Sequence, residues 1–120
     1  MAISFTSKGV ITVKYQSLRI DVLSRMSYSL KISYGGTEYR VRDYVNGQIV
    51  VQEPHCPIDM KDVRPLLRRM SSMTDREKIE YETLLANAAA DGEVWKVTDW
   101  LNRRMFDYRG LIDKNMAVEM

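Results

Sequence analysis

The spacing of apolar residues changes once along this chain of 120 residues, near residue 53, and this change constrains the fold more than any other feature. Before it, apolar residues recur at every second position, as where Leu30 and Ile32 alternate with Ser29, Lys31 and Ser33. After it, they recur at spacings of three and four. The first period is typical of half-buried strands and the second of amphipathic helices. Strands followed by helices predict an α+β fold.

Four runs in the amino-terminal half predict strands, at about residues 11–15, 18–22, 28–34 and 39–45. Gly35-Gly36 joins two of them, and Asn46-Gly47 separates the last from another apolar run. Both dipeptides accept the positive φ angles of a two-residue hairpin loop. The connections before residue 18 and after residue 23 are weaker, so residues 18–30 could contain a bend or bulge. We expect an antiparallel β-meander of four or five strands, with one apolar face and one solvated face.

The helical half begins after a joint at residues 54–58, where Pro54 and Pro57 cannot donate ladder hydrogen bonds. Three helices are predicted beyond it, with a final turn near Asp107. The first, within 59–70, would be capped by Asp62 with Pro65 in its first turn. The second starts with a Thr74–Glu77 capping box, carries Ile79, Leu84, Leu85 and Ala88 on one stripe, and ends at Asp91-Gly92. The third places Val94, Val97, Trp100 and Leu101 on one face.

These elements predict a single domain over residues 1–120, with three or four short helices packed on one face of the meander. The meander would occupy 1–53 and the helices 59–120. Cys56 is the only cysteine, which excludes an internal disulfide and favours a reducing compartment. No segment resembles a secretory leader or approaches about 18 consecutive apolar residues. We therefore expect a cytoplasmic protein that does not enter a membrane.

Catalytic chemistry has little support in the sequence. His55 and Cys56 are the only residues of their types, and neighbours in an extended segment point apart. A metal site needs three or four ligands, and a catalytic cysteine needs a base within hydrogen-bond reach. The carboxylates of residues 75–82 alternate with Arg76 and Lys78, as on a solvated helix face. We predict no enzyme, no cofactor and no metal.

Charge is unevenly distributed, with a formal +4 on residues 1–52 and −2 on residues 53–120. Strand alternation would direct most of the amino-terminal basic side chains to the solvated face. The predicted surface comprises Lys14, Arg19, Arg25, Lys31, Arg40, Arg42 and Tyr44. Several folds hold single-stranded nucleic acid on such a face. Basic residues also keep strand faces soluble and edges unpaired, so both interpretations stay open here.

Residues 98–116 are rich in aromatic residues and arginine. We expect most large apolar residues of this region to anchor the helices on the sheet, and Arg103 and Arg104 to face water. The expected anchor residues are Trp95, Trp100, Leu101, Phe106, Tyr108, Leu111 and Ile112. A tryptophan left exposed would instead indicate a site for a partner.

Two segments, VRPLLRRMSSMTDREKIEY and WLNRRMFDYRGLIDKNMAVEM, resemble uncharacterised short proteins of prophages and mobile elements of gut anaerobic bacteria. The resemblance covers about residues 61–120 and assigns no activity or catalytic residue. It implies a phage-type or mobile-element origin. We therefore expect a non-enzymatic accessory protein that binds a protein partner. The alternative is a nucleic-acid-binding module that uses the basic sheet face, and homo-oligomerisation is left open.

Overall fold

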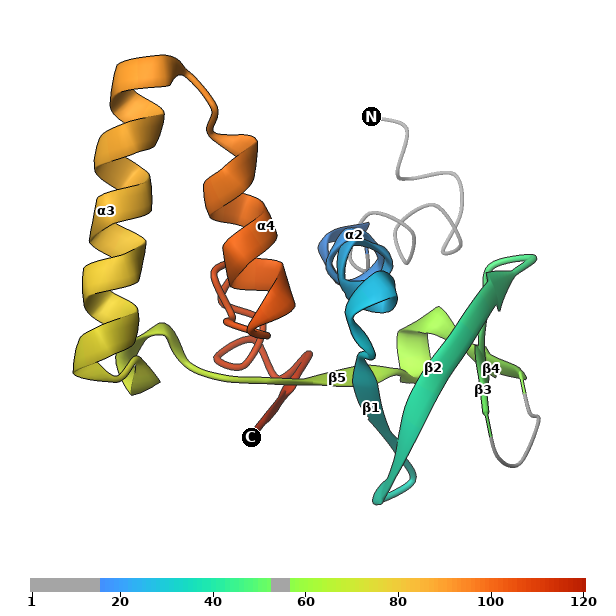
Figure 1. Ribbon diagram of the computed structural model, residues 1–120. Coiled ribbons are helices and arrows are strands. Elements are labelled where there is room, and N and C mark those ends of the chain that lie inside the picture. Colours follow the sequence, from blue (N-terminus) through green and yellow to red (C-terminus); the bar gives the residue numbers. More distant parts are fainter. Residues whose placement is uncertain (1–15, 53–56) are drawn as a thin grey trace, which may run out of the picture. The chain divides into compact units, whose positions relative to one another are not determined.

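The computed structural model describes residues 16–52 and 57–120, and the chain divides into two compact units between Pro65 and Leu66 (Figure 1). The first unit contains α2 (Gln16–Arg25), η2 (Met26–Tyr28), β1 (Lys31–Tyr34), β2 (Thr37–Val45), β3 (Gln48–Val51), β4 (Pro57–Asp59) and η3 (Met60–Asp62). The second contains η4 (Met70–Ser72), α3 (Asp75–Asp91), α4 (Trp95–Arg103) and β6 (Val118–Glu119). Strand β5 (Arg64–Leu67) crosses the boundary. The α+β class is confirmed.

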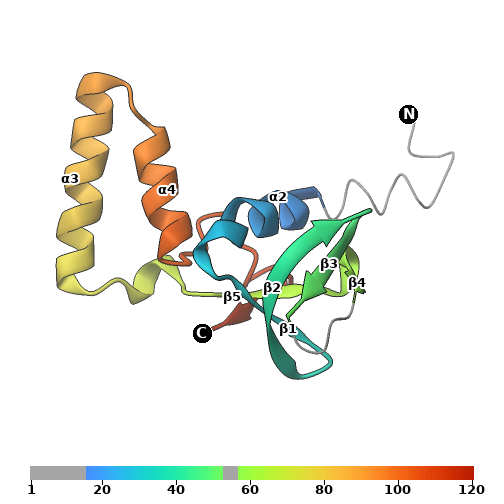
Figure 2. The ribbon, with the colours of Figure 1, turned by 45° about the vertical axis from the view of Figure 1, so that its right-hand side comes forward.

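The strands of the first unit are antiparallel, in the order β4-β3-β2-β1-β5 (Figure 2). The two tight turns predicted from glycine dipeptides are confirmed. Gly35 and Gly36 have φ angles of 59° and 82°, and Asn46 and Gly47 have φ angles of 51° and 80°. Positive φ at both loop residues is the geometry that matches the twist of two-residue hairpins.

One face of this sheet carries the core of the first unit. Leu30, Ile32 and Val41 are buried as the predicted alternation requires, and Ile49, Val51 and Ile58 of the next two strands are buried with them. Residues opposite one another in register share a face, as Val41 and Val51 do. Strands β1 to β4 form the meander, and β5 returns to pair with β1. The expected meander is thus present, with its strands shifted toward the carboxyl end, because residues 18–22 are not a strand.

Residues 16–25 form helix α2, so the strand predicted at 18–22 is wrong. The apolar pattern at Leu18, Ile20 and Val22 fits period two, but only Leu18 and Val22 are buried, while Ile20 is 47% exposed. Leu18 and Val22 are four residues apart and lie on one helical face. Asp21 and Arg25 have the same spacing and pair on that side of the helix. The strand predicted at 11–15 lies outside the described residues.

The helix predicted within 59–70 is also wrong, because this segment forms β4, η3, β5 and η4. Pro65 sits within β5, opposite Ile32, in place of a first helical turn. The residue before a proline is restricted to extended backbone, which explains why Arg64 begins a strand. Pro65, Leu66 and Leu67 are all buried in succession, unlike one face of a surface helix. Part of the predicted joint, Pro57 and Ile58, belongs to β4.

Helices α3 and α4 run side by side as a hairpin in the second unit (Figure 1). The predicted capping box is confirmed: Glu77 N donates to Thr74 Oγ1 at 3.1 Å, and Thr74 N donates to Glu77 Oε1 at 2.9 Å. Gly92 ends α3 with a φ of 79°. The capping box and the left-handed glycine explain why both ends of α3 could be predicted from the sequence.

The core of the second unit lies between the two helices and the segment after them. It comprises Met73, Ala88, Val97, Trp100, Leu101 and Phe106. The predicted burial of Trp100, Leu101 and Phe106 is confirmed. On α3 the buried stripe is formed by Tyr81, Leu84 and Ala88, because Ile79 and Leu85 are exposed. Packing of the helices on the sheet, and a single domain, stay predictions.

Strand β6 completes the second unit by pairing in parallel with the end of β5, where Leu66 lies opposite Val118. Arg69 reinforces this arrangement by donating to Asp113 at 2.8 Å and to Glu119 at 2.9 Å. Asp107 accepts from the backbone N–H groups of Leu111 and Ile112, each at 2.9 Å. Asp107 therefore acts as a cap, as expected, but the residues that follow it form a run of turns and no regular helix.

Candidate functional site

The basic surface predicted from strand alternation is only partly assembled. Lys14 lies outside the described residues. Arg19 and Arg25 lie on α2, so their predicted place on the solvated sheet face is wrong. Arg25 is fully buried and donates to both carboxylate oxygens of buried Asp21, at 3.0 and 2.9 Å. A buried, doubly hydrogen-bonded arginine stabilises packing and offers no charge to a ligand.

Tyr44 is also misplaced by the prediction, because a β-bulge changes the alternation of β2. The register pairs Val41 with Val51 but Asp43 with Val50, so one extra residue, Arg42, is inserted. Beyond the bulge, Tyr44 lies opposite the buried Ile49 and shares its face. A one-residue insertion moves every later side chain to the opposite face. Tyr44 is therefore half-buried on the core side.

Three of the predicted basic residues remain together on the exposed side: Lys31, Arg40 and Arg42. Lys31 and Arg40 lie directly opposite each other on β1 and β2. Arg40 and Arg42 line a shallow hollow of about 480 Å³ together with Glu38, Tyr39 and Gln52. The sequence identified these cations but could not show the hollow, since it depends on the bulge and on the start of the loop after β3.

The charge balance around this hollow is mixed. Glu38 lines it, and Asp43 lies just beyond the bulge with its carboxylate bound to the N–H of Tyr44 at 2.7 Å. Neither Lys31 nor Arg40 has an ion-pair partner in the part of the chain that the structure describes. The result is a small basic site in place of the broad basic face that alternation predicted.

The arginines at the base of the helical hairpin are arranged differently. Arg68 donates to both oxygens of Glu77 at 2.9 and 2.8 Å and lies 4.3 Å from the centre of the Phe106 ring. Its hydrogen bonds lower the pKa of Glu77 from 4.5 to about 2. Arg104 lies 4.6 Å from the centre of the Trp100 ring and donates to Glu80 at 3.1 Å. Arg104 is half-buried, so its expected exposure to water is only partly correct.

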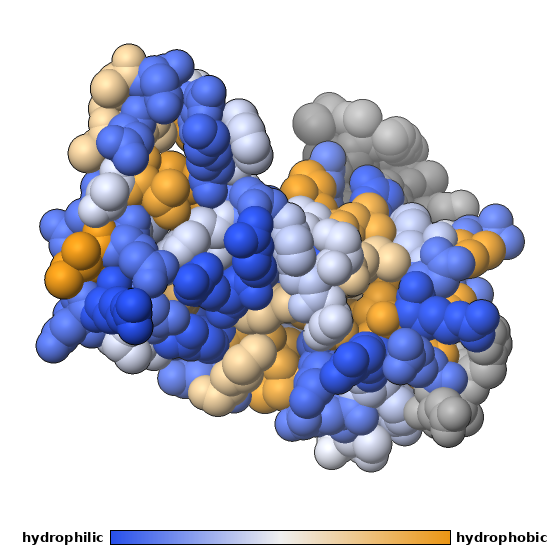
Figure 3. Space-filling model, viewed as in Figure 1, coloured by the Kyte–Doolittle hydropathy of each residue, from blue (hydrophilic) through white to orange (hydrophobic). Residues whose placement is uncertain are grey.

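The far end of the helical hairpin exposes large apolar side chains. Trp95 is 65% exposed and Val94 is 62% exposed at the start of α4. Trp95 was expected to help cover the sheet, but it lies away from the face of Val97, Trp100 and Leu101. Its position in the sequence carried the signal, because a residue two before Val97 falls outside that helical face. Apolar patches appear among hydrophilic side chains over α3 and α4 (Figure 3).

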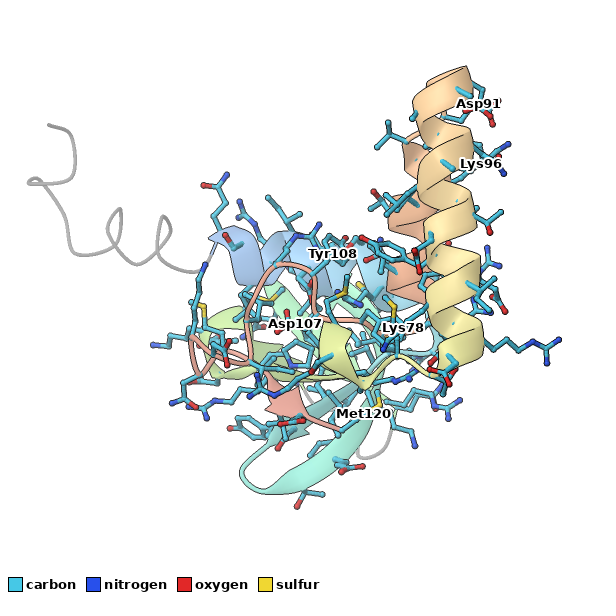
Figure 4. All side chains as sticks on the ribbon, turned by 90° about the vertical axis from the view of Figure 1, so that its left-hand side faces the viewer. Lys78, Asp91, Lys96, Asp107, Tyr108 and Met120 are labelled. Carbon is cyan, nitrogen blue, oxygen red and sulfur yellow. The ribbon has the colours of Figure 1, made fainter. Side chains whose placement is uncertain are left out.

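Asp91 and Lys96 mark this far end, well away from Lys78 near the beginning of α3 (Figure 4). Lys96 forms an ion pair with Glu93, which raises the pKa of the lysine. The side chain of Asp91 accepts from the N–H of Glu93 at 2.8 Å. Residues 75–103, the two helices and their connection, include seven acidic and four basic residues, a formal charge of −3. The hairpin is therefore acidic around an exposed tryptophan.

No cluster of three potential metal ligands occurs within residues 16–52 and 57–120. His55 and Cys56 lie outside those ranges. Within the same ranges, no helix is long and apolar enough to cross a membrane. Comparison with family models, curated proteins and solved structures finds no match to this chain. A phage-type origin therefore stays a prediction from the sequence resemblance.

Proposed function

We propose that this chain is a non-enzymatic accessory protein, of phage or mobile-element type, that binds a protein partner through the far end of its helical hairpin. The observation that supports this proposal is the exposure of Trp95, at 65%, beside Val94. The proposal places the protein in the cytoplasm, because a single cysteine suits a reducing compartment.

The contrast between the two tryptophans supports the choice of site. Trp100 is 7% exposed, stacks between Tyr81 and Phe106, and donates from Nε1 to Glu80. Trp95, five residues earlier on the same helix, is 65% exposed, and the Lys96 ammonium lies 5.9 Å from the centre of its ring. Tryptophan is among the residues most enriched at the energetic centres of protein interfaces. Trp95 is therefore available to a partner, whereas Trp100 belongs to the core.

The charge near Trp95 indicates the chemistry of the partner. Arg68 and Arg104 neutralise Glu77 and Glu80 at the base of the hairpin. The other acidic residues of 75–103 still outnumber the basic ones: Asp75, Glu82, Asp91, Glu93 and Asp99 against Arg76, Lys78, Lys96 and Arg103. Two of them are paired, Glu93 with Lys96 and Asp99 with Arg103. Complementary potentials increase association rates and exclude partners of like charge. The fitting partner is a protein with an apolar pocket for an indole ring, bordered by lysine or arginine.

Affinity capture with a matched pair of variants tests this function. Three proteins are immobilised: the wild type, Trp95→Ala and the control Ile79→Ala. Each is exposed to lysate of a bacterium that carries a prophage or mobile element of the type implied by the sequence resemblance. Ile79 is equally exposed, at 66%, but lies near the start of α3. We expect a protein retained by the wild type and by Ile79→Ala but not by Trp95→Ala, with melting temperatures unchanged.

The captured protein is then purified and its affinity measured directly. We expect Trp95→Ala to weaken binding at least about 30-fold, the loss typical of an interface hot spot of about 2 kcal/mol. Added salt should slow association with the wild type, because the charges steer the encounter. Equal retention by all three proteins, or equal affinities, would contradict the assignment of this site.

A further inference from the structure

We propose that Lys31, Arg40 and Arg42 bind the phosphate backbone of a single-stranded nucleic acid on the exposed side of the first unit's sheet, where Arg40 and Arg42 line the hollow and Lys31 lies opposite Arg40. This site is separate from the protein-binding role proposed for the helical hairpin, and it shares no residue with it. Three observations support it: a like-charge pair, a bulge and a hollow.

Lys31 and Arg40 form a like-charge pair directly across β1 and β2. Like charges at opposed positions destabilise an antiparallel ladder. Across the described residues, no carboxylate forms an ion pair with either side chain. A bound phosphate would relieve the repulsion between Lys31 and Arg40.

The bulge in β2 adds a third cation to this pair. Arg42 is the inserted residue between Val41 and Asp43, so it has no opposite residue in the register. Bulges often re-aim a side chain next to a functional site. In a strand without the bulge, Arg40, Arg42 and Tyr44 would all lie on the same face. The bulge instead turns Tyr44 to the core side and leaves Arg42 lining the hollow.

The hollow suits a single strand better than a duplex. It is shallow and opens on a sheet, whereas sequence readers of duplex DNA insert a helix or ribbon into the major groove. Sheet faces that hold single strands combine backbone-tracking cations with aromatic rings and polar groups. Gln52 lines this hollow beside the two arginines. Tyr39 borders it too, but lies opposite the buried Ile32 in the register, so its ring belongs to the core side of the sheet. Glu38, also in the lining, opposes anion binding and keeps the expected affinity modest.

Fluorescence anisotropy of labelled oligothymidylate with the full chain tests the proposal. Binding should weaken with salt, with a slope of log affinity against log salt of about −2, as expected for three contacts to a single strand. A duplex of the same length should bind more weakly. Displacement of the oligonucleotide by equimolar inorganic phosphate would indicate a site for free anions and would overturn the proposal.

Charge-matched variants separate this site from general attraction by a basic unit. Arg40→Glu and Arg42→Glu should each reduce affinity at least about tenfold, since each removes a cation and repels phosphate. Lys61→Glu makes the same change in net charge at an exposed residue of the same unit and should have a much smaller effect. Equal losses in all three variants, or no salt-dependent binding by the wild type, would overturn the proposal.

A negative result at this site would not contradict the protein-binding role proposed for the helical hairpin, because the two sites share no residue. For the same reason, Trp95→Ala should bind oligothymidylate as the wild type does. The fold of each variant is checked by its melting temperature. Arg40→Glu should melt no lower than the wild type, because a glutamate opposite Lys31 replaces repulsion with attraction.

Discussion

Two pairs of basic residues, one in each unit of this protein, have different surroundings. In the second unit, Arg68 and Arg104 lie on aromatic rings and bind carboxylates at the same time. In the first unit, Lys31 and Arg40 face each other across two strands without an acidic partner among the described residues. A cation that is stacked and paired holds structure together, whereas two opposed cations leave charge available to a ligand.

A similar contrast is found between the aromatic residues. Trp100, Tyr81 and Phe106 form one stack, with ring centres 5.8 and 5.6 Å apart along it. Trp95 takes no part in the stack and is mostly exposed. The role of an arginine or a tryptophan in this protein therefore depends on the residues around it and not on its type alone.

The largest effect is expected at the centre of the aromatic stack. Trp100→Ala should destabilise the protein by about 3–5 kcal/mol through lost burial and a cavity. Trp95→Ala should change stability by less than about 0.5 kcal/mol, because an exposed side chain loses little on truncation. Chemical denaturation of both variants measures the difference. Similar losses of stability would show that the two tryptophans are not divided between core and surface.

A smaller effect is expected at the ion pair between Arg68 and Glu77. The pKa of Glu77 falls from 4.5 to about 2 in the folded protein. A lowered folded-state pKa gives stability that is full above about 4.5 and is lost as the pH falls toward about 2. Glu77→Gln should cost about 1–3 kcal/mol at neutral pH, since it removes charge from hydrogen bonds with Arg68.

Thermal melting between pH 2 and pH 7 tests both parts of this expectation. The variant should lose less stability than the wild type over the acidic range. Parallel curves for the two proteins would contradict the assignment of the pH dependence to Glu77.

Backbone geometry provides a comparable test in the first unit. Gly47 has a φ of 80° in the tight turn between β2 and β3, with open space where a Cβ would lie. Gly47→Val should therefore act by strain alone and cost about 1–3 kcal/mol. Gly47→Asn, which tolerates this region, should cost less. An unchanged melting temperature for the valine variant would show that the turn adapts.

The smallest effect is expected at the like-charge pair and has the opposite sign. Arg40→Glu should stabilise the protein by about 0.2–1 kcal/mol at low salt by pairing with Lys31. The gain should shrink as salt screens the pair. Destabilisation by Arg40→Glu at low salt would mean that the arginine is held by contacts other than its charge, and the contrast between the units would be weaker.

Much of the fold was predictable wherever a local residue pattern dictates the backbone. The turns at Gly35-Gly36 and Asn46-Gly47 need positive φ, and the Thr74–Glu77 box satisfies its own N–H groups. Residues 18–22 lacked such a signal. Their apolar residues fit two periods, and the choice depends on burying Asp21 with Arg25, a tertiary event that the pattern does not encode.

The candidate sites were predictable only in their residue types. Lys31, Arg40 and Arg42 could be named from alternation, but a single inserted residue decided that Arg42 stays with them and Tyr44 does not. Trp95 was grouped with the anchor residues, although its position two before Val97 places it outside the face of Val97, Trp100 and Leu101. Placing these side chains requires the register and the packing, which follow from contacts between distant residues.

Glu77 has two structural roles, and together they limit which substitutions this position tolerates. Its Oε1 accepts from the N–H of Thr74 and from Arg68, while its Oε2 accepts from Arg68 and lies 4.0 Å from Arg104 Nε. Glutamine could still cap the helix but would bind the guanidinium poorly, and alanine could do neither. Substitutions at positions 68 and 77 should therefore be non-additive, so that a change at one alters which residues the other tolerates. In relatives of this chain, we expect these two positions to vary together.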